Sequence, residues 1–318
     1  MAFNENPQLD SHVVDIMGRK AIWFGISIAY LVPSIIAIFL CLQHFGAPVK
    51  LGIEFTGGTL MQVTYKQPEK FSAVRAALQK DGIQAKVESS TDFKTFNIRS
   101  PFMGKDKSIA VKKSLEQLGP VDEKHFSLDS VGPTVGKQLL QNAAMALGIG
   151  VLGILMFITF RYQFDFALSA IIAMVHDGLV MVGTFAILSL AVGAEANSLL
   201  VVALLTIMGF SVHDTIVVFD RFRENLKFAK KGDTFADVAN RSVNQTFARS
   251  INTSLTVILT LLPLVIFGGH TIFFFTFVML IGVISGTYSS IFNASPILVL
   301  IRDRGRSKSN QSAANSIA

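Results

Sequence analysis

Asp214 and Arg249 are ionisable residues in two successive, mainly apolar runs of the chain, 198–219 and 246–268. An ionised side chain at the centre of a bilayer costs roughly 2.5–3.5 kcal/mol on insertion scales. A carboxyl group in such a place holds its proton tightly, and an approaching guanidinium favours release of that proton. The two residues therefore predict a proton or ion relay. The alternative is a fixed Asp214–Arg249 ion pair that only joins two helices.

A second acid, Asp177, lies within another apolar run, and each acid directly follows a histidine, in His176-Asp177 and His213-Asp214. Asp177 is either a second relay residue or a hydrogen-bonded packing residue. Successive residues of a helix project about 100° apart. We therefore expect His176 and His213 to bond neighbouring helices rather than to carry protons.

The spacing of the histidines argues against a metal site and against a catalytic one. No His-Glu-x-x-His motif is present, and no two histidines stand four residues apart within an apolar run. The sequence therefore predicts no metal ligands, no cofactor other than the coupling ion, and no enzyme.

Arg249 is one of seven polar residues that form a stripe along one face of the same predicted helix. In a membrane, such a face must contact protein or water rather than lipid. The stripe consists of Ser242, Thr246, Arg249, Asn252, Thr253, Thr256 and Thr260.

The composition is that of an integral membrane protein. Of the 318 residues, 51% are hydrophobic and 16% are charged, and the mean hydropathy is +0.50. Because much of the net charge of +6 flanks apolar runs, it indicates orientation and not nucleic-acid binding. The single cysteine, Cys41, excludes an intramolecular disulfide.

Six runs are long enough to cross a bilayer, which takes about 20 mostly apolar residues. Lysine and arginine occur in the segments 1–20 and 220–245 and in the basic tail 302–318, whereas the short links 192–197 and 269–270 hold none. The three basic segments are therefore expected to be cytoplasmic, together with both termini. The segment 44–137 also has many lysines, but long translocated segments do not follow the charge rule. The predicted spans are 21–43, 138–160, 166–191, 198–219, 246–268 and 271–301.

The last run, 271–301, carries no charge and is expected to form one tilted helix that ends along the membrane interface. Gly282 and Gly286, like Ser285 and Ser289, stand four residues apart. Small residues at this spacing let helix backbones approach closely, so we expect dense helix packing here.

The segment 44–137 is long enough to fold alone outside the cytoplasm. Its pattern predicts strands and helices in the order β-α-β-β-α-β, the order of a ferredoxin-like domain. The first predicted strand, 52–65, has a kink at Gly57-Gly58. The remaining predicted elements are helices 68–81 and 106–118 and strands 83–88, 92–99 and 124–130.

Several long motifs together resemble the SecF family of bacterial protein-export subunits. The most distinctive is GFSVHDTIVVFDRFREN at 209–225. The others are GIEFTGGT at 52–59, VGPTVG at 131–136, NQTFARSINT at 244–253 and GVISGTYSS at 282–290. The similarity extends over roughly 20–303, in order, with the same six-span layout.

The resemblance implies an accessory subunit of the Sec translocase in the bacterial inner membrane, within the resistance-nodulation-division superfamily. Such subunits pair with SecD, act beside the SecYEG channel, and use the proton-motive force on a preprotein after the SecA-driven steps; some relatives use sodium. Asp214 and Arg249 match the family's relay residues, and Thr253 lies one turn after the arginine. His213 stands where many relatives have asparagine.

Two other functions remain open from the residues. One is a non-transporting scaffold of the translocon, with Asp214–Arg249 as a structural pair. The other is a small-molecule exporter of the same superfamily, for which the external segment is small.

Overall fold

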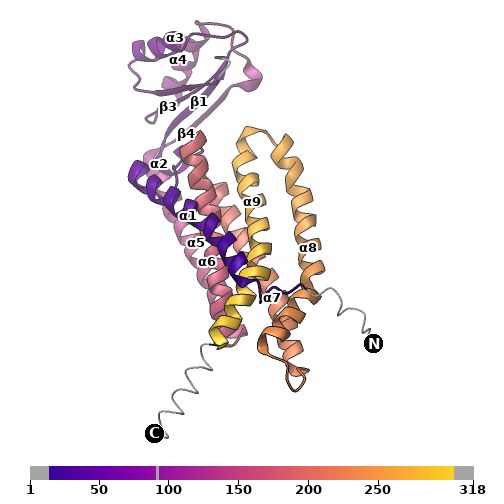
Figure 1. Ribbon diagram of the computed structural model, residues 1–318. Helices are drawn as coiled ribbons and strands as arrows, with labels where there is room; N and C mark the ends of the chain where they lie inside the picture. The colour runs from indigo at the N-terminus through magenta and orange to yellow at the C-terminus, as the bar shows by residue number, and fades with distance from the viewer. Residues whose placement is uncertain (1–13, 91–92, 304–318) are drawn as a thin grey trace. The chain divides into compact units, whose positions relative to one another are not determined.

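The computed structural model describes residues 14–90 and 93–303 (Figure 1). They form two compact units. Leu51–Ala146 and Glu195–Ser198 make up the first, here called the sheet unit. The remaining described residues make up the second, here called the helical unit. The tail predicted at 302–318 and the N-terminal segment predicted at 1–20 lie largely outside the described residues.

The sheet unit contains one four-stranded antiparallel sheet in the order β2-β3-β1-β4. This order, with a helix after the first strand and another after the third, is that of a ferredoxin-like domain, as predicted. The strands are β1 (Gly58–Thr64), β2 (Lys86–Ser89), β3 (Thr95–Ser100) and β4 (Ser127–Val131). The helices are α3 (Phe71–Lys80), α4 (Lys105–Glu116) and a short 3₁₀ turn, η2 (Glu123–His125).

Alternating residues of the two central strands bury the core of this sheet. Met61 and Val63 of β1 lie opposite Ile98 and Phe96 of β3. Strand side chains point alternately to the two faces, so one face of each strand meets the buried residues of α3 and α4. The Tyr65 hydroxyl donates to the Leu115 carbonyl of α4 at 3.0 Å, and burial raises the pKa of this phenol.

The prediction of a strand from residue 52 was wrong at its start. Residues Ile53–Thr56 form a helical turn, α2, and β1 begins only at Gly58. Gly57 and Gly58 both have positive φ angles, 71° and 127°. A Cβ on Gly57 would lie 2.8 Å from the Cα of Pro133. The two glycines therefore turn the chain sharply where only residues without a side chain fit.

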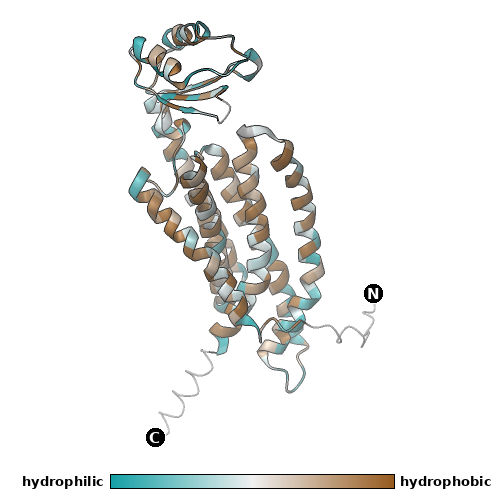
Figure 2. Cartoon of the chain, turned by 45° about the horizontal axis from the view of Figure 1, so that its top comes forward, coloured by the Kyte–Doolittle hydropathy of each residue, from teal (hydrophilic) through white to brown (hydrophobic). Residues whose placement is uncertain are grey.

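Within residues 14–90 and 93–303, six helices are long and apolar enough to cross a membrane, and Figure 2 shows hydrophobic residues along most of their length. The last one continues from α9 through a π-helical segment, η3 (Ser290–Ala294), to residue 303. They agree with the six predicted spans. Their bounds are α1 (Lys20–Phe45), α5 (Pro133–Arg161), α6 (Phe164–Val192), α7 (Ser198–Lys227), α8 (Phe235–Phe267) and α9 (Gly269–Ser289).

The connection predicted at 220–245 is mostly helical. Helix α7 continues to Lys227 and α8 begins at Phe235, so only 228–234 link them. Thr234 caps α8 in a capping box with Asp237, in which each side chain accepts a hydrogen bond from the other residue's backbone N–H.

The described part of the N-terminal segment packs on the start of α8. The side-chain oxygen of Asn240 accepts from the backbone N–H groups of Ile16 and Met17, both at 3.0 Å. Both of these side chains are buried in the core of the helical unit. The N–H of Gly18 and the side chain of Asn240 hold the pKa of Asp15 below its ordinary value.

Phe96→Ala should destabilise the sheet unit by about 3–5 kcal/mol, because it empties a fully buried site between strand and helices. Phe93→Ala is the matched control, since that ring is 50% exposed. Limited proteolysis of the full chain in detergent should cleave the Phe96 variant much faster within 51–146. Equal cleavage rates for the two variants would contradict this assignment of the core.

Candidate functional site

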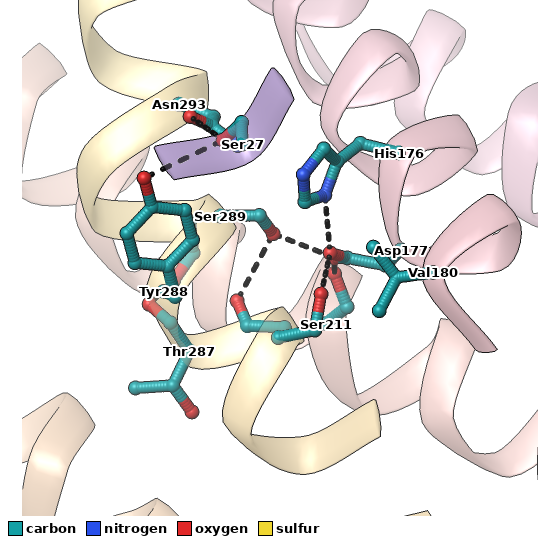
Figure 3. A network of polar contacts seen from close by, with 12 residues as sticks. Ser27, His176, Asp177, Val180, Ser211, Thr287, Tyr288, Ser289 and Asn293 are labelled. Atoms are coloured by element: carbon teal, nitrogen blue, oxygen red, sulfur yellow. Dashed lines mark hydrogen bonds and ion pairs between the residues drawn. The ribbon is translucent and has the colours of Figure 1, made fainter. Parts of the chain in front are cut away.

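Asp177 is the centre of a buried polar network in the helical unit (Figure 3). Its side chain is completely buried on α6. Oδ1 accepts from the Ser285 hydroxyl at 2.8 Å and bonds the His176 Nδ1 at 2.9 Å. Oδ2 accepts from the hydroxyls of Ser211, at 2.5 Å, and Ser289, at 2.6 Å. The network thus joins α6, α7 and α9 at one carboxyl group.

This set of partners matches an ionised carboxylate. An ionised carboxyl group has no proton to donate and offers about four lone-pair sites. Three serine hydroxyls and one ring N–H fill these sites on Asp177. Removing a charge from water costs several kcal/mol unless such bonds replace the lost hydration. Hydrogen bonds from α6, α7 and α9 therefore hold the Asp177 carboxyl group in place.

Small residues on α9 allow this arrangement. Ser285 and Ser289 are four residues apart and so lie on the same face of the helix. A Cβ on Gly286, between them, would lie 3.0 Å from the Ser211 Cβ. The glycine therefore lets α7 and α9 approach until short serine side chains can reach Asp177. This close approach of α7 and α9 agrees with the prediction of dense helix packing at Gly282 and Gly286. The hydrogen bonds from Ser285 and Ser289 to Asp177 were not predicted.

Asp214 of α7 is 4% exposed and has one hydrogen-bond donor, the hydroxyl of Ser290, at 2.6 Å from Oδ2. Ser290 opens the π-helical segment η3, and its neighbour Ser289 donates to Asp177. Two consecutive serines of the last span thus bind the two buried acids. Single π-helical turns of this kind are frequent at functional sites.

Asp214 and Arg249 are not brought together. Arg249 is exposed on α8, and within the described residues it takes part in no ion pair. Its carbonyl accepts the hydroxyl of Thr253 at 2.9 Å, a bond within the same helix. The structure therefore does not contain the fixed pair that would join α7 to α8. The relay itself stays a prediction.

The two histidines differ from the expectation. His176 bonds the adjacent Asp177 on its own helix, with Nδ1 2.9 Å from Oδ1. The prediction of a bond to a neighbouring helix was therefore wrong for His176. His213 is exposed on α7, and no described residue bonds it. Between residues 14 and 303, the described chain holds no group of three or more His, Cys, Asp or Glu that fits a metal ion.

The predicted polar stripe of α8 divides into two parts. Ser242 and Thr246 are buried near the start of the helix. Further along, the face toward α9 carries Ser250 and Ser254, and the Ser254 hydroxyl bonds Thr287 of α9. The other stripe residues lie on a different, exposed face, which we call the polar face of α8: Arg249, Asn252, Thr253, Thr256 and Thr260.

Sequence reasoning missed the serines that bind the acids: Ser211, Ser285, Ser289 and Ser290. Their signal was weak, because a serine in an apolar span usually bonds the carbonyl four residues back. The useful clue was the i, i+4 serine pair within a span that has no charge of its own.

Comparisons with known proteins agree with this architecture. The sequence profile described as "Protein export membrane protein SecD/SecF, C-terminal" matches residues 110–304. The profile "SecD/SecF GG Motif" matches 45–69, the segment that contains the Gly57-Gly58 turn.

Curated relatives cover nearly the whole chain. The protein translocase subunit SecF of Thermobaculum terrenum is 41% identical over 90% of this chain and 93% of its own length. The SecF subunit of Synechocystis is 40% identical over 88% of this chain and 91% of its own length. The SecF subunit of Pseudomonas aeruginosa is 33% identical over 86% of this chain and 88% of its own length.

Two solved structures share the fold. The crystal structure of SecDF from Thermus thermophilus, a translocon-associated membrane protein, has a TM-score of 0.77 and 29% identity. It covers 93% of this chain, and this chain covers 39% of it. The super-membrane-facing form of SecDF has a TM-score of 0.65 and is 28% identical in sequence. The match covers 95% of this chain and 40% of the SecDF chain. The chain thus spans about two fifths of these longer proteins.

Six apolar helices and a ferredoxin-like domain inserted after the first define a multi-pass membrane protein of the SecD/SecF type. Within that type, the identity over nearly the full length of SecF subunits is decisive. The chain belongs to the SecF family of protein translocase subunits, a family of the bacterial inner membrane.

Gly286→Leu should separate α7 from α9 and lower the thermal unfolding midpoint in detergent, because the added side chain meets Ser211. Overpacking of this kind costs about 1–3 kcal/mol. Gly178→Leu is the control on α6, beside Asp177, where nothing lies within 4 Å of an added Cβ. A Gly286 variant as stable as the Gly178 variant would show that close approach is not required.

Proposed function

We propose that this protein is the SecF partner of a SecD protein and that the pair uses the proton-motive force to draw preproteins outward. The membership of the SecF family supports the role in Sec export. The solved relatives are named SecDF, and this chain covers only 39% and 40% of them, which supports SecD as the partner. The observation that carries the proton coupling is Asp214, a buried acid with one hydroxyl donor.

Asp214 suits a relay better than Asp177 because it is less firmly bound. One serine bond is easily replaced, whereas four partners hold Asp177. Arg249, without a carboxylate partner among the described residues, is available to approach an acid in another conformation. Each proton crossing 100 mV supplies about 2.3 kcal/mol, which shifts a two-state equilibrium by more than tenfold.

The polar face of α8 supports the pairing with SecD. Arg249 and the four polar residues beside it are exposed along a helix that is otherwise apolar enough to span a membrane. The threonine hydroxyls on this face donate to carbonyls of their own helix, but Arg249 and Asn252 would lose their hydrogen bonds to water without replacement if they faced lipid. A second membrane protein against this face, or water held between the two, satisfies them. SecD is the occupant that the solved relatives favour.

The remaining partners follow from the proposed role. The protein acts beside the SecYEG channel, its sheet unit faces the preprotein outside the cytoplasm, and both termini are cytoplasmic. The proton is the proposed coupling ion, with sodium as the alternative. A scaffold without transport is less well supported, because no Asp214–Arg249 pair joins the helices within the described residues. No structural observation favours a small-molecule exporter.

Asp214→Asn should abolish the part of preprotein translocation that depends on the proton gradient. The asparagine side chain has the shape of the aspartate and its oxygen can still accept the hydrogen bond from Ser290, but it cannot bind or release a proton. The measurement is translocation into vesicles that contain SecYEG, SecA and SecD, with and without a gradient. Asp220→Asn is the control, an exposed acid on the same helix. Normal gradient dependence in an assembled Asp214 variant would refute the relay.

Thr256→Cys should form a cross-link to single cysteines in the spans of SecD, because Thr256 lies in the middle of the polar face of α8. Leu255→Cys is matched in depth and is also exposed, but it projects about 100° away on the helix. It should cross-link weakly. Equal cross-linking at the two positions, or none at Thr256, would place SecD elsewhere.

A further inference from the structure

His176 is a buried titratable group that the proposed relay does not use. Its side chain is 9% exposed and lies on α6 next to the completely buried Asp177. Its Nδ1 bonds the Asp177 carboxylate, while its Nε2 is buried with no hydrogen-bond partner in the structure. In Figure 3 the second ring nitrogen points away from the carboxylate.

The network fixes which ring nitrogen carries hydrogen. Three serine hydroxyls lie within hydrogen-bond distance of Asp177 and can donate to it, which is the arrangement that suits an ionised carboxylate. Beside an ionised carboxylate the Nδ1 is the donor, and the hydrogen of the neutral ring then sits on Nδ1. The Nε2 then presents a free lone pair. A buried polar atom without a partner is uncommon in native structures and calls for an explanation.

We propose that His176 is a second proton-binding site, which takes a proton on Nε2 while Asp177 serves as its fixed counter-ion. No bond of the network has to break. The Nδ1–H continues to donate to Oδ1, the neutral imidazole becomes an imidazolium, and the new charge lies beside an existing negative one. A carboxylate that orients an imidazole through Nδ1–H stabilises the imidazolium in the same way in hydrolase triads.

The surroundings contain no competing base among the described residues. Helix α6 packs against α1, α9 and η3. The ionisable groups that α1 turns toward α6 are Tyr30 and Cys41, which bond Thr184 and the Ala186 carbonyl. Helix α9 contributes Tyr288, bonded to the Trp23 carbonyl of α1. Helix α7 contributes Asp214, which accepts from Ser290.

This site is connected to the proposed relay. Ser289 bonds Asp177 and Ser290 bonds Asp214, and both serines lie at the start of the π-helical segment. A change of charge at His176–Asp177 therefore acts on the helix turn that also holds Asp214. This connection rests on the proposed function, whereas proton binding by His176 does not.

A proton fits this site better than sodium. Each carboxylate oxygen of Asp177 already has two partners, so a cation would have to displace serine hydroxyls. The Nε2 lone pair has no partner to lose when it takes a proton, and the Asp177 carboxylate on the other side of the ring balances the charge of the imidazolium.

The test is a pH titration of the full chain, labelled with ¹⁵N-histidine, in lipid nanodiscs without SecD. At high pH, one of the 6 histidines should show a neutral ring protonated on Nδ1, and it should become an imidazolium on acidification. His176→Gln should remove this signal. His213→Gln, the same change in the repeated His-Asp pair on an exposed position, should leave it unchanged.

Asp177→Asn should move the same titration to lower pH by about 1–3 units, because an opposite charge at this range has that effect. A ring that stays neutral at all pH values, or that is protonated on Nε2 at high pH, would overturn the proposal without any variant having to fold. Exchange of potassium for sodium should change nothing. A titration displaced by sodium would assign the site to that ion instead.

The outcome is separate from that of the export assay. Loss of gradient-dependent export in Asp214→Asn tests the relay, and the histidine titration tests the second site. If the titration is as expected while Asp214→Asn exports normally, the site is real and the relay is wrong.

Discussion

A carboxylate inside a bundle of spanning helices persists only where donors replace the water it has lost, and Asp177 shows how strictly this requirement shapes the bundle. Its four partners come from three helices. Hydrogen bonds between spanning helices are worth only about 0.6 kcal/mol on average. Their importance here lies less in net stability than in the cost of losing one, because the charge would remain buried without its partner.

The same requirement explains why the last span carries glycines and serines where larger apolar residues would pack equally well against lipid. Serine hydroxyls are short, so the helices must approach closely before they can reach a carboxylate. Gly286 allows that approach. Where α9 passes into the π-helical segment, the consecutive residues Ser289 and Ser290 bond different acids. Packing and polar recognition thus depend on one another in this helix.

The two acids have contrasting environments, and this contrast organises the functional argument. Asp177 is held by many bonds, whereas Asp214 has a single hydroxyl donor. Arg249 lies on the polar face of α8 and not against either acid. The described chain therefore keeps Asp214 and Arg249 apart, and under the proposed function a second membrane protein covers the polar face of α8. This is the physical basis for treating the chain as one part of a larger assembly.

The sequence by itself determined the six spans, the β-α-β-β-α-β order and the family, because these depend on run length, hydrophobic periodicity and long motifs. It also singled out Asp214, Arg249, Asp177 and the polar stripe, since charge is rare at such depth. Only the tertiary structure decided which residues meet. The helical turn before Gly57-Gly58, the serines around Asp177, the Ser290 bond and the separation of Arg249 from Asp214 depend on helix rotation and close approach. A single sequence records neither, because a serine or a histidine in a span is equally compatible with several neighbours.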